Sequence, residues 1–474
     1  MSFSLIRLTL VVSLLALSHG ATFTGWAEDE INGDDQQGEL FQDLFKSVIQ
    51  NPEESNSDKD EDDCSYDGKD DLWLRWPPKA KLIHEWMTVE YKLGCPGVEE
   101  ILVDYGEYVP HANWISGIDV YKDEVYITAP RVKNARGIPS GLNRVVKKDG
   151  KSLLEPYPNL SWHRLGRCSA LQMPMSIEID PNSGYMYVID AGRVGITSST
   201  PGNYCPAKIM ILNLNDNGRL VRSHDLPDSV VSRTSNFLND IVLDYVTPDG
   251  PEVRYAYMTD TGDASLVVFD FQRNSSWIFK DKSMQTDENS VMTINGVNYT
   301  LNFPINGIAM SPNFDYVYYS VIGSKKLFQI PTSVLRNKDA DFGTHVRDLG
   351  EKAGSSDGMI AGKKNIYYGA LERNAVYEWQ RSRDIESQKV SEGQVNVTHE
   401  RKLDSDHVTM QWPDSFTLDV KGYLWFTSER AQLFLNNKMD FSGSQGANFR
   451  IFRIYVDDVS YLTKPKNVKQ WWDW

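Results

Sequence analysis

The chain has 474 residues, a formal net charge of −16 and 24% charged residues. The acidity is local, because residues 28–71 hold 17 Asp and Glu against three Lys, a net of −14. Without a basic patch the chain is not expected to bind nucleic acid. No stretch reaches the ~20 consecutive apolar residues of a membrane span, so no membrane span is predicted.

The N-terminus has the order of a secretory signal peptide: Arg7 precedes an apolar run from Leu8 to Leu17, and small residues follow. We therefore expect residues 1–20 to be a signal peptide and the mature protein to be secreted and extracellular. Four sequons fit that compartment and are predicted glycosylation sites. They begin at Asn159, Asn274, Asn298 and Asn396.

Residues 21–80 form a predicted acidic extension that is mostly disordered, because its charge is high and its apolar content low. Within it, apolar side chains recur at helical spacing and predict a short amphipathic helix. They are Leu40, Phe41, Leu44, Phe45, Val48 and Ile49. Docking on the body of the protein is the simpler role for this helix, and binding a protein partner is the alternative.

The four cysteines, Cys64, Cys95, Cys168 and Cys205, are expected to pair in an oxidising compartment. Four cysteines allow three pairings, and we favour nearest neighbours, Cys64 with Cys95 and Cys168 with Cys205. A zinc site is the alternative, but the sequence has neither C-x-x-C nor H-E-x-x-H.

A related phrase occurs six times along the chain, as in "MPMSIEIDPNSGYMYVID" and "FPINGIAMSPNFDYVYYS". Each copy has small polar residues, alternating apolar residues, a turn and a second strand rich in aromatics. The copies start 59, 62, 68, 52 and 57 residues apart, at Trp114, Met173, Ser235, Phe303, Ser355 and Trp412.

Further strands follow each pair, and helical periodicity is almost absent from this region, so each unit is predicted to be a four-stranded sheet. Six such sheets protect their edges by closing into a ring. The sequence therefore predicts an all-β fold, a six-bladed β-propeller over residues 81–460 with a C-terminal tail at 461–474. Two β-sandwich domains are the rival, but they would not require the same phrase six times.

In such a ring the first strand of each blade lines a central channel, and the residues that open these strands converge at one mouth. Those residues are Asn113, Trp114, Ser116, Met175, Ser176, Asn239, Asp240, Asn306, Ser356, Asp357, Asp414 and Ser415. The repeat therefore predicts a composite site that no single unit contains.

The runs "YVPHANWISGIDVYKDEVYITAPR", "YVIDAGRVGI", "SSDGMI" and "WPDSFTLDVKGYLWFTSERAQLFL" together resemble the yellow and major royal jelly protein family over about residues 86–457. The resemblance implies a secreted six-bladed propeller. Members of the family include dopachrome-converting or pigmentation proteins of melanin formation, salivary proteins that bind biogenic amines in the channel, and nutritive proteins. By the same resemblance, ligand contacts fall at Asp414 and at Ser428, Glu429 and Arg430.

The leading functional hypothesis is a channel that binds a small aromatic amine or a catechol derivative, with no cofactor. A protonated amine gains from carboxylates in a shielded channel, and its ring gains from aromatic walls. The predicted polar contacts are Asp414, Glu429, Ser428, Asn306, Asp357 and Asn239, and the predicted walls are Phe416 and Trp114, with Trp412 and Phe237 beside them.

Conversion of dopachrome is the alternative, and it needs a base. Only His111 among the histidines lies near an inner-strand start, and Asp357 or Asp414 could replace it, so no catalytic residue is assigned. Nutritive storage, with neither binding nor turnover, is a third possibility. The sequence identifies no ligand and no oligomeric state.

Calcium-dependent hydrolysis of a lactone is a further alternative, because "INGIAMSP" and "SSDGMI" also resemble gluconolactonase and regucalcin-like propellers. That resemblance places a metal at Asn239, Asn306 and Asp357, but the first blade supplies no Glu at the matching place. Calcium takes six to eight oxygens, several of them charged. "GSSDG" also satisfies G-x-S-x-G with Ser356 as nucleophile, but no helix is predicted to follow it.

Overall fold

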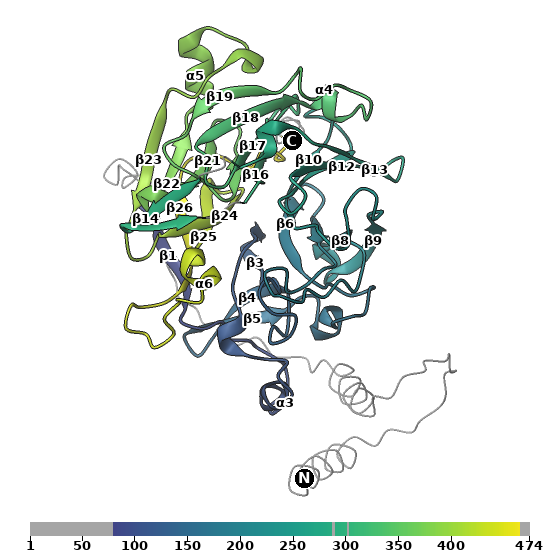
Figure 1. The fold of residues 1–474 in the computed structure, drawn as a ribbon, viewed down its shortest axis with the longest axis vertical. Helices are drawn as coiled ribbons and strands as arrows, with labels where there is room; N and C mark the ends of the chain where they lie inside the picture. The colour runs from purple at the N-terminus through teal and green to yellow at the C-terminus, as the bar shows by residue number, and fades with distance from the viewer. Residues whose placement is uncertain (1–78, 287–289, 301–302, 465–474) are drawn as a thin grey trace, which may run out of the picture. The chain divides into compact units, whose positions relative to one another are not determined.

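The structure is a computed structural model that describes residues 79–286, 290–300 and 303–464. Cys64, the predicted signal peptide, the predicted amphipathic helix and nearly all of the acidic extension lie outside the described residues. The described chain is all-β and forms the predicted six-bladed propeller (Figure 1).

Five blades are built from four consecutive antiparallel strands each. Blade 1 holds β2 (Ile118–Tyr121), β3 (Glu124–Thr128), β4 (Leu142–Lys148) and β5 (Lys151–Pro156). Blade 2 holds β6 (Pro174–Asp180), β7 (Tyr185–Asp190), β8 (Lys208–Asn213) and β9 (Arg219–Asp225). Blade 3 holds β10 (Leu238–Asp244), β11 (Tyr255–Asp260), β12 (Ser265–Asp270) and β13 (Ser275–Phe279).

Blade 4 holds β16 (Ile305–Met310), β17 (Tyr316–Val321), β18 (Lys326–Pro331) and β19 (Arg347–Glu351). Blade 5 holds β20 (Met359–Ala361), β21 (Ile366–Ala370), β22 (Ala375–Trp379) and β23 (Glu400–Ser405). A hairpin of β14 (Val291–Ile294) and β15 (Val297–Thr300) precedes blade 4. Short helices lie between strands or blades: α3 (Val98–Asp104), α4 (Thr332–Leu335), α5 (Arg381–Gln388) and α6 (Ala431–Leu435).

Blade 6 combines strands from both ends of the described chain. Its sheet has the order β24 (Trp412–Leu418), β25 (Tyr423–Glu429), β26 (Phe449–Tyr455) and β1 (Lys81–Trp86). The antiparallel register of β1 and β26 runs from Lys81 opposite Arg453 to Trp86 opposite Phe449. This pairing closes the ring, and Figure 1 shows the purple β1 beside the yellow strands of blade 6.

The inner strands β2, β6, β10, β16, β20 and β24 each contact the inner strands of both neighbouring blades. Four of these strands have an irregular register with their second strand just after they begin, for example between Ile305 and Ile308 of β16. A bulge turns a side chain away from the regular alternation of a strand. The inner-strand starts can therefore present neighbouring side chains to the channel.

Carboxylates on the inner strands join the blades to one another. Asp119 on β2 accepts hydrogen bonds from Ile179 N in blade 2 at 2.6 Å and from Thr417 Oγ1 in blade 6 at 2.6 Å. Asp240 on β10 accepts one from Ser176 Oγ in blade 2 at 2.9 Å. Each bond satisfies a buried polar group and fixes the position of a neighbouring inner strand.

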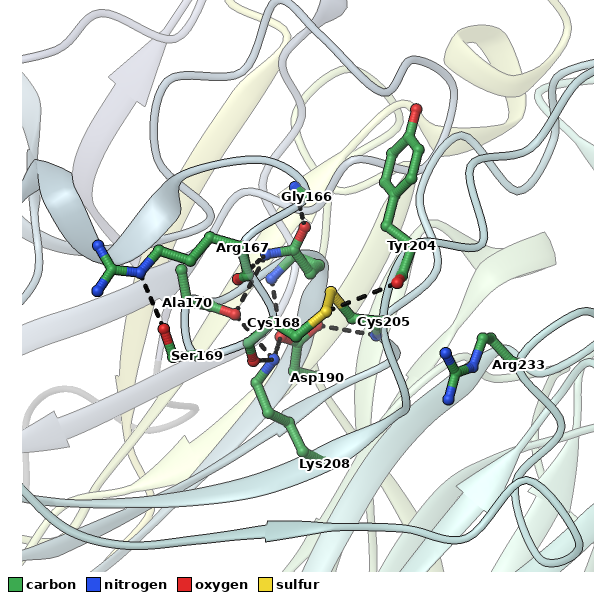
Figure 2. Close-up of a disulfide and its surroundings, with 12 residues drawn as sticks. Gly166, Arg167, Cys168, Ser169, Ala170, Asp190, Tyr204, Cys205, Lys208 and Arg233 are labelled. Carbon is green, nitrogen blue, oxygen red and sulfur yellow. Dashed lines mark hydrogen bonds and ion pairs between the residues drawn. A yellow bond between two sulfur atoms is a disulfide. The ribbon is translucent and has the colours of Figure 1, made fainter. Parts of the chain in front are cut away.

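The predicted bridge between Cys168 and Cys205 is present, and it holds two loops of blade 2 together (Figure 2). Beside it the Lys208 ammonium, 1% exposed, lies 2.9 Å from Asp190 Oδ2 and donates to the Cys168 carbonyl at 3.1 Å. Cys95 is exposed, and its predicted partner Cys64 is outside the described residues.

The sequon asparagines Asn274, Asn298 and Asn396 are exposed and Asn159 is half-buried, and glycosylation at all four stays a prediction. Within residues 79–464 as described, no helix has the length and apolar character needed to cross a membrane.

Candidate functional site

A pocket opens at the end of the ring where the inner strands begin, and we call it the mouth pocket. It holds about 440 Å³ of free space, part of it open solvent. All six blades contribute to its lining, which comprises Trp114, Ser116, Val132, Met175, Thr197, Phe237, Asn239, Phe303, Asn306, Ile322, Asp357, Trp412, Asp414 and Leu435. These lining residues include no Lys, Arg or His.

One position of the repeat supplies a lining residue from every blade. In chain order these residues are Ser116, Met175, Asn239, Asn306, Asp357 and Asp414. They stand at or next to the start of the inner strands, so the ring closure that joins the blades also brings them into one circle. These residues, which the repeat predicts to converge at one mouth, line one pocket, and their role in binding stays a prediction.

Three carboxyl groups lie together on the side of the pocket formed by blades 5 and 6. Asp357, Asp414 and Glu429 are 9%, 4% and 2% exposed, and Asp414 is hydrogen-bonded to the other two and to Ser116. No N–H donor among the described residues reaches Asp414 Oδ2 or either oxygen of Glu429. Protons held between the carboxyl groups, or a cationic ligand, can satisfy these oxygens.

Burial is the main cause of the raised pKa values in this carboxyl cluster. It raises the pKa of Asp414 to about 6. Burial and the neighbouring charge of Asp414 hold the pKa of Asp357 and of Glu429 well above the usual range. Because like charges in one site resist joint ionisation, the cluster keeps protons near neutral pH and gains from a positive ligand.

Aromatic side chains form much of the remaining wall. Trp114, Phe237, Phe303 and Trp412 line the pocket. Trp114 packs edge to face on Phe434 of α6, with ring centroids 5.2 Å apart. An aromatic ring placed between such walls would find both apolar contact and edge-to-face partners.

Deeper in the channel lies a second cavity, the inner chamber, with about 330 Å³ of free space by the same measure. Each blade contributes at least one apolar residue to it, and the full set is Ile118, Ile177, Ile241, Val242, Ile308, Met359, Ile360 and Phe416. Polar groups of Ser176, Glu178, Asp240 and Ser415 also line it. Phe416, predicted to be a wall of the ligand site, therefore lies in the inner chamber and not in the mouth pocket.

Three other predicted contacts lie behind the pocket wall. Ser428, fully buried, donates to the Thr409 carbonyl at 2.9 Å, and Glu429 reaches the site through Asp414. The Arg430 guanidinium binds Asn448 Oδ1 at 3.0 Å and the Gln445 carbonyl at 2.6 Å. The lining of the mouth pocket includes none of these three residues, Ser428, Glu429 and Arg430.

The remaining sequence candidates have structural partners. Ser356 is fully buried, its hydroxyl lies 3.2 Å from that of Ser320, and β20 follows it. His111 stacks on Phe441 with centroids 4.3 Å apart. Neither residue lines the mouth pocket.

The three predicted calcium ligands, Asn239, Asn306 and Asp357, all line the mouth pocket. However, Asp357 Oδ2 already accepts a hydrogen bond from Trp412 Nε1, and Asn239 Nδ2 lies 3.3 Å from Thr261 Oγ1. The described part of the chain contains no group of three or more His, Cys, Asp or Glu side chains that could hold a metal ion. One carboxylate and two amides are fewer charged oxygens than calcium prefers.

The sequence did not identify the lining residues that come from loops. Val132 and Thr197 follow the second strands of blades 1 and 2, and Leu435 ends α6 after β25. The only sequence feature that these residues share is their position after the second strand of a repeat unit. The loops at that position differ in length, so the residues do not align. Phe303 could have been identified more easily than these loop residues, because it is the first residue of the fourth repeat unit.

The model of the major royal jelly protein family matches residues 173–464 of the chain. Among curated proteins, the chain is 23% identical over 398 residues to major royal jelly protein 7 of Apis mellifera, an alignment that covers 82% of this chain and 87% of that protein. It is 24% identical over 398 residues to major royal jelly protein 1 of the same species, covering 81% and 89%. It is also 23% identical over 385 residues to protein yellow of Drosophila yakuba, covering 78% and 67%.

Among solved structures, a luciferin-regenerating enzyme matches 80% of this chain and 95% of its own, at 13% identity and a TM-score of 0.42. Regucalcin, a calcium-binding protein from Agrobacterium tumefaciens, matches 80% and 97% at 10% identity and a TM-score of 0.38. Likeness at this level does not identify a function.

Proposed function

The chain belongs to the major royal jelly protein family, and on that premise we propose that it is a secreted propeller that binds a small aromatic amine or a catechol derivative in the mouth pocket. The observation that carries the proposal is the buried carboxyl cluster of Asp357, Asp414 and Glu429, which has oxygens without a donor. Burying charges of one sign is costly unless a partner of opposite sign arrives.

An ammonium group fits the cluster chemically. It brings three N–H donors and a positive charge to a cluster in which Asp414 Oδ2 and both oxygens of Glu429 accept no hydrogen bond from a described N–H group. The lining residues of the mouth pocket offer no competing Lys, Arg or His. Asn239 and Asn306 add neutral polar groups beside the cluster, and these suit a hydroxyl or a second N–H of the ligand.

The aromatic part of the ligand is proposed to lie among Trp114, Phe237 and Trp412. The apolar side chains of Val132 and Leu435 close the pocket beside them. Pockets that bind small molecules combine such apolar walls with a few polar groups that set orientation. A monoamine with one ring meets both requirements.

Isothermal titration with dopamine and serotonin at pH 7.5 tests the proposal. Saturable heat with one site per chain is expected, and phenol or catechol without the amine should bind more weakly. Absence of saturable heat for both amines at high micromolar concentration would contradict the proposal.

A second candidate function is tautomerisation of dopachrome, favoured by one observation: the pKa of Asp414 is raised to about 6, close to neutral. A base with such a pKa can take the C–H proton of the substrate, and a protonated Asp357, which lines the same pocket, can give a proton to the quinone-type oxygen. The step moves protons only and needs no oxidant. Loss of dopachrome absorbance that is faster with protein than without, and unchanged by chelator, is the expected sign.

A further inference from the structure

The last described segment of the chain, residues 457–464, packs inside the ring at the end opposite to the mouth pocket. Sequence reasoning placed residues from 461 onward in a tail, but Tyr461 and Leu462 are 0% and 1% exposed and belong to the main hydrophobic core. The segment follows β26 of blade 6 and pairs with blade 5, where Ser460 forms a β-bridge with Gly362. We call it the floor segment.

Tyr461 contacts four blades at once. Its N–H lies 3.3 Å from the Ala361 carbonyl of blade 5, and its hydroxyl accepts a hydrogen bond from Leu243 N of blade 3 at 2.8 Å. The hydroxyl is also hydrogen-bonded to Glu178 of blade 2, and the ring lies 6.0 Å from that of Phe314, which follows β16 of blade 4. A residue whose side chain has partners in three blades of a ring, and whose backbone N–H has one in a fourth, must lie close to the axis of that ring.

The contacts of Tyr461 also place it directly below the inner chamber. Glu178 lines that chamber, and Val242, the neighbour of Leu243, lines it as well. The phenol therefore separates the chamber from the face of the propeller where the floor segment lies.

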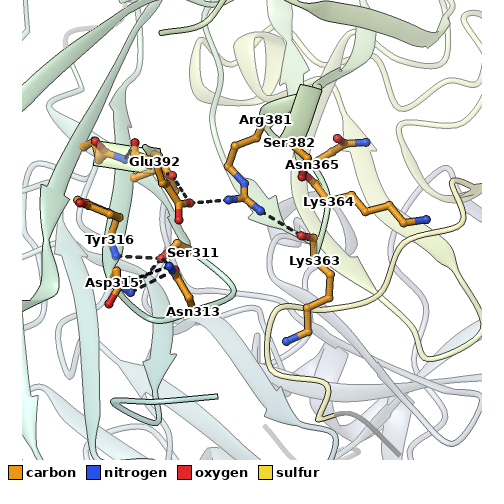
Figure 3. Close-up of polar contacts among 12 residues, drawn as sticks. Ser311, Asn313, Asp315, Tyr316, Lys363, Lys364, Asn365, Arg381, Ser382 and Glu392 are labelled. Carbon is orange, nitrogen blue, oxygen red and sulfur yellow. Dashed lines mark hydrogen bonds and ion pairs between the residues drawn. The ribbon is translucent and has the colours of Figure 1, made fainter. Parts of the chain in front are cut away.

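The turn that carries the floor segment is itself held in place. Asp458 accepts hydrogen bonds from Lys364 N and Asn365 N, both at 3.1 Å. Arg381 donates to the Lys363 carbonyl at 3.0 Å and pairs with Glu392, as Figure 3 shows. A Cβ on Gly362 would lie 2.2 Å from Asp458 Oδ2, so a side chain there would displace the Asp458 carboxylate from these bonds.

The far end of the floor segment is fixed to blades 2 and 3. Asn182 Nδ2 donates to the Leu462 carbonyl at 2.9 Å, and Lys464 Nζ donates to the Gly250 carbonyl at 2.6 Å. The segment thus crosses the ring from blade 5 to blades 2 and 3 with attachments on both sides.

From this course we propose that the floor segment seals one end of the channel, with Tyr461 as the plug, so that solutes reach the inner chamber only through the mouth pocket. The proposal does not depend on which ligand the mouth pocket binds. The central channel is then open at the mouth pocket and closed at the other end by the floor segment of the chain itself.

Thiol accessibility tests the seal. Val242, 1% exposed, lines the inner chamber beside the plug, and Val242→Cys is a small change that places a reporter there. Methyl methanethiosulfonate is the probe, and mass spectrometry of the peptide that contains position 242 separates this thiol from the native cysteines. We expect the rate in the full chain to be limited by entry through the mouth pocket, and a rate roughly ten-fold or more higher when Tyr461→Ala opens a second, direct route at the floor.

Tyr461→Phe is the matched control, since it keeps the ring and removes only the hydroxyl, and it should leave the rate within about two-fold. A chain that ends at Lys464 should behave like the full chain. Equal rates with and without Tyr461→Ala, in variants that melt as folded proteins, would overturn the proposal.

Hydrogen exchange on the unchanged protein gives a second test that needs no folded variant. The Leu243 amide donates to the Tyr461 hydroxyl, so it should exchange as slowly as the amide of Ile241 on the same strand. Exchange at Leu243 that is roughly ten-fold faster would mean that the far end opens readily, and it would overturn the seal.

Discussion

Trp412 Nε1 donates a hydrogen bond to Asp357 Oδ2 at 2.8 Å, and this bond ties blade 6 to blade 5 at the edge of the mouth pocket. Trp412→Phe keeps an aromatic ring but leaves a buried carboxyl oxygen without its donor. We expect the free energy of unfolding to fall by about 1–3 kcal/mol, the cost of an unsatisfied buried acceptor. Urea denaturation at pH 7.5 measures the change.

Trp277→Phe is the matched control for this substitution. Its indole donates to the Leu335 carbonyl at 3.0 Å, away from the pocket. Both variants should lose stability, but only Trp412→Phe should also weaken amine binding. If the two variants bound the amine equally well, Trp412 would not be part of the binding site.

The blades could be predicted from the sequence because each repeats one local pattern of polar start, alternating strand and turn. The partner of β26 could not, since "KLIHEW" at 81–86 resembles none of the six units and pairs with a strand more than 360 residues later. Long-range pairing of this kind leaves no periodic signal in either segment. The closed ring was therefore predictable, and the strand β1 that closes it was not.

The same distinction applies to the candidate site. Asn306, Asp357 and Asp414 were predictable because they occupy one position of the repeat. Phe416, two residues after Asp414 on β24, lines the inner chamber and not the mouth pocket. Side chains two residues apart on a strand point to the same side but lie about 7 Å apart along it, and the sequence pattern does not show at which of these levels a ligand would lie.

Closure of the ring predicts a large effect at Trp86 on β1. This side chain is 4% exposed, and its indole donates to the Ser152 carbonyl of blade 1 at 2.7 Å. Trp86→Ala removes buried apolar area and this bond, so we expect a loss of about 3–5 kcal/mol in the free energy of unfolding. Leu82→Ala on the same strand, at a side chain 41% exposed, should cost far less. Similar losses for both would show that β1 does not hold the ring.

Buried carboxyls in the channel predict how stability depends on pH. Burial raises the pKa of Asp119 and of Asp240 to about 7. A carboxyl whose pKa is higher in the folded state stabilises the fold while protonated, and this contribution is lost as pH rises through the folded pKa. Between pH 6.5 and 8 each group should therefore cost roughly 1 kcal/mol of stability.

Asp240→Asn tests this expectation, because the amide cannot ionise. The fall in stability between pH 6.5 and 8 should shrink by roughly 1 kcal/mol relative to the parent chain. The window stops at 6.5 because burial lowers the pKa of His84 to about 4 and that of His163 to about 3, so both oppose the trend at lower pH. If the variant lost as much stability between pH 6.5 and 8 as the parent chain does, ionisation of Asp240 would not contribute to the pH dependence.

The carboxyl cluster predicts how amine affinity responds to charge. At pH 7.5 Asp414, with its pKa raised to about 6, is mostly ionised and can pair with an ammonium. Asp414→Asn removes that charge at nearly constant shape, so dopamine affinity should fall by roughly 10- to 100-fold, as expected for a hydrogen bond to a charged group. Asp339→Asn, at an exposed residue of another blade, is the control and should bind as the parent does.

The pH profile of binding distinguishes the charge of Asp414 from its shape. In the parent chain, lowering the pH from 7.5 to 5 should weaken dopamine binding by about ten-fold, because protonation of a group with a pKa near 6 competes with the ligand. Asp414→Asn should largely flatten this profile. Since the pocket is proposed to bind the amine without calcium, chelator should leave both profiles unchanged. A loss of binding in chelator that added calcium restores would instead place a metal beside Asn239, Asn306 and Asp357.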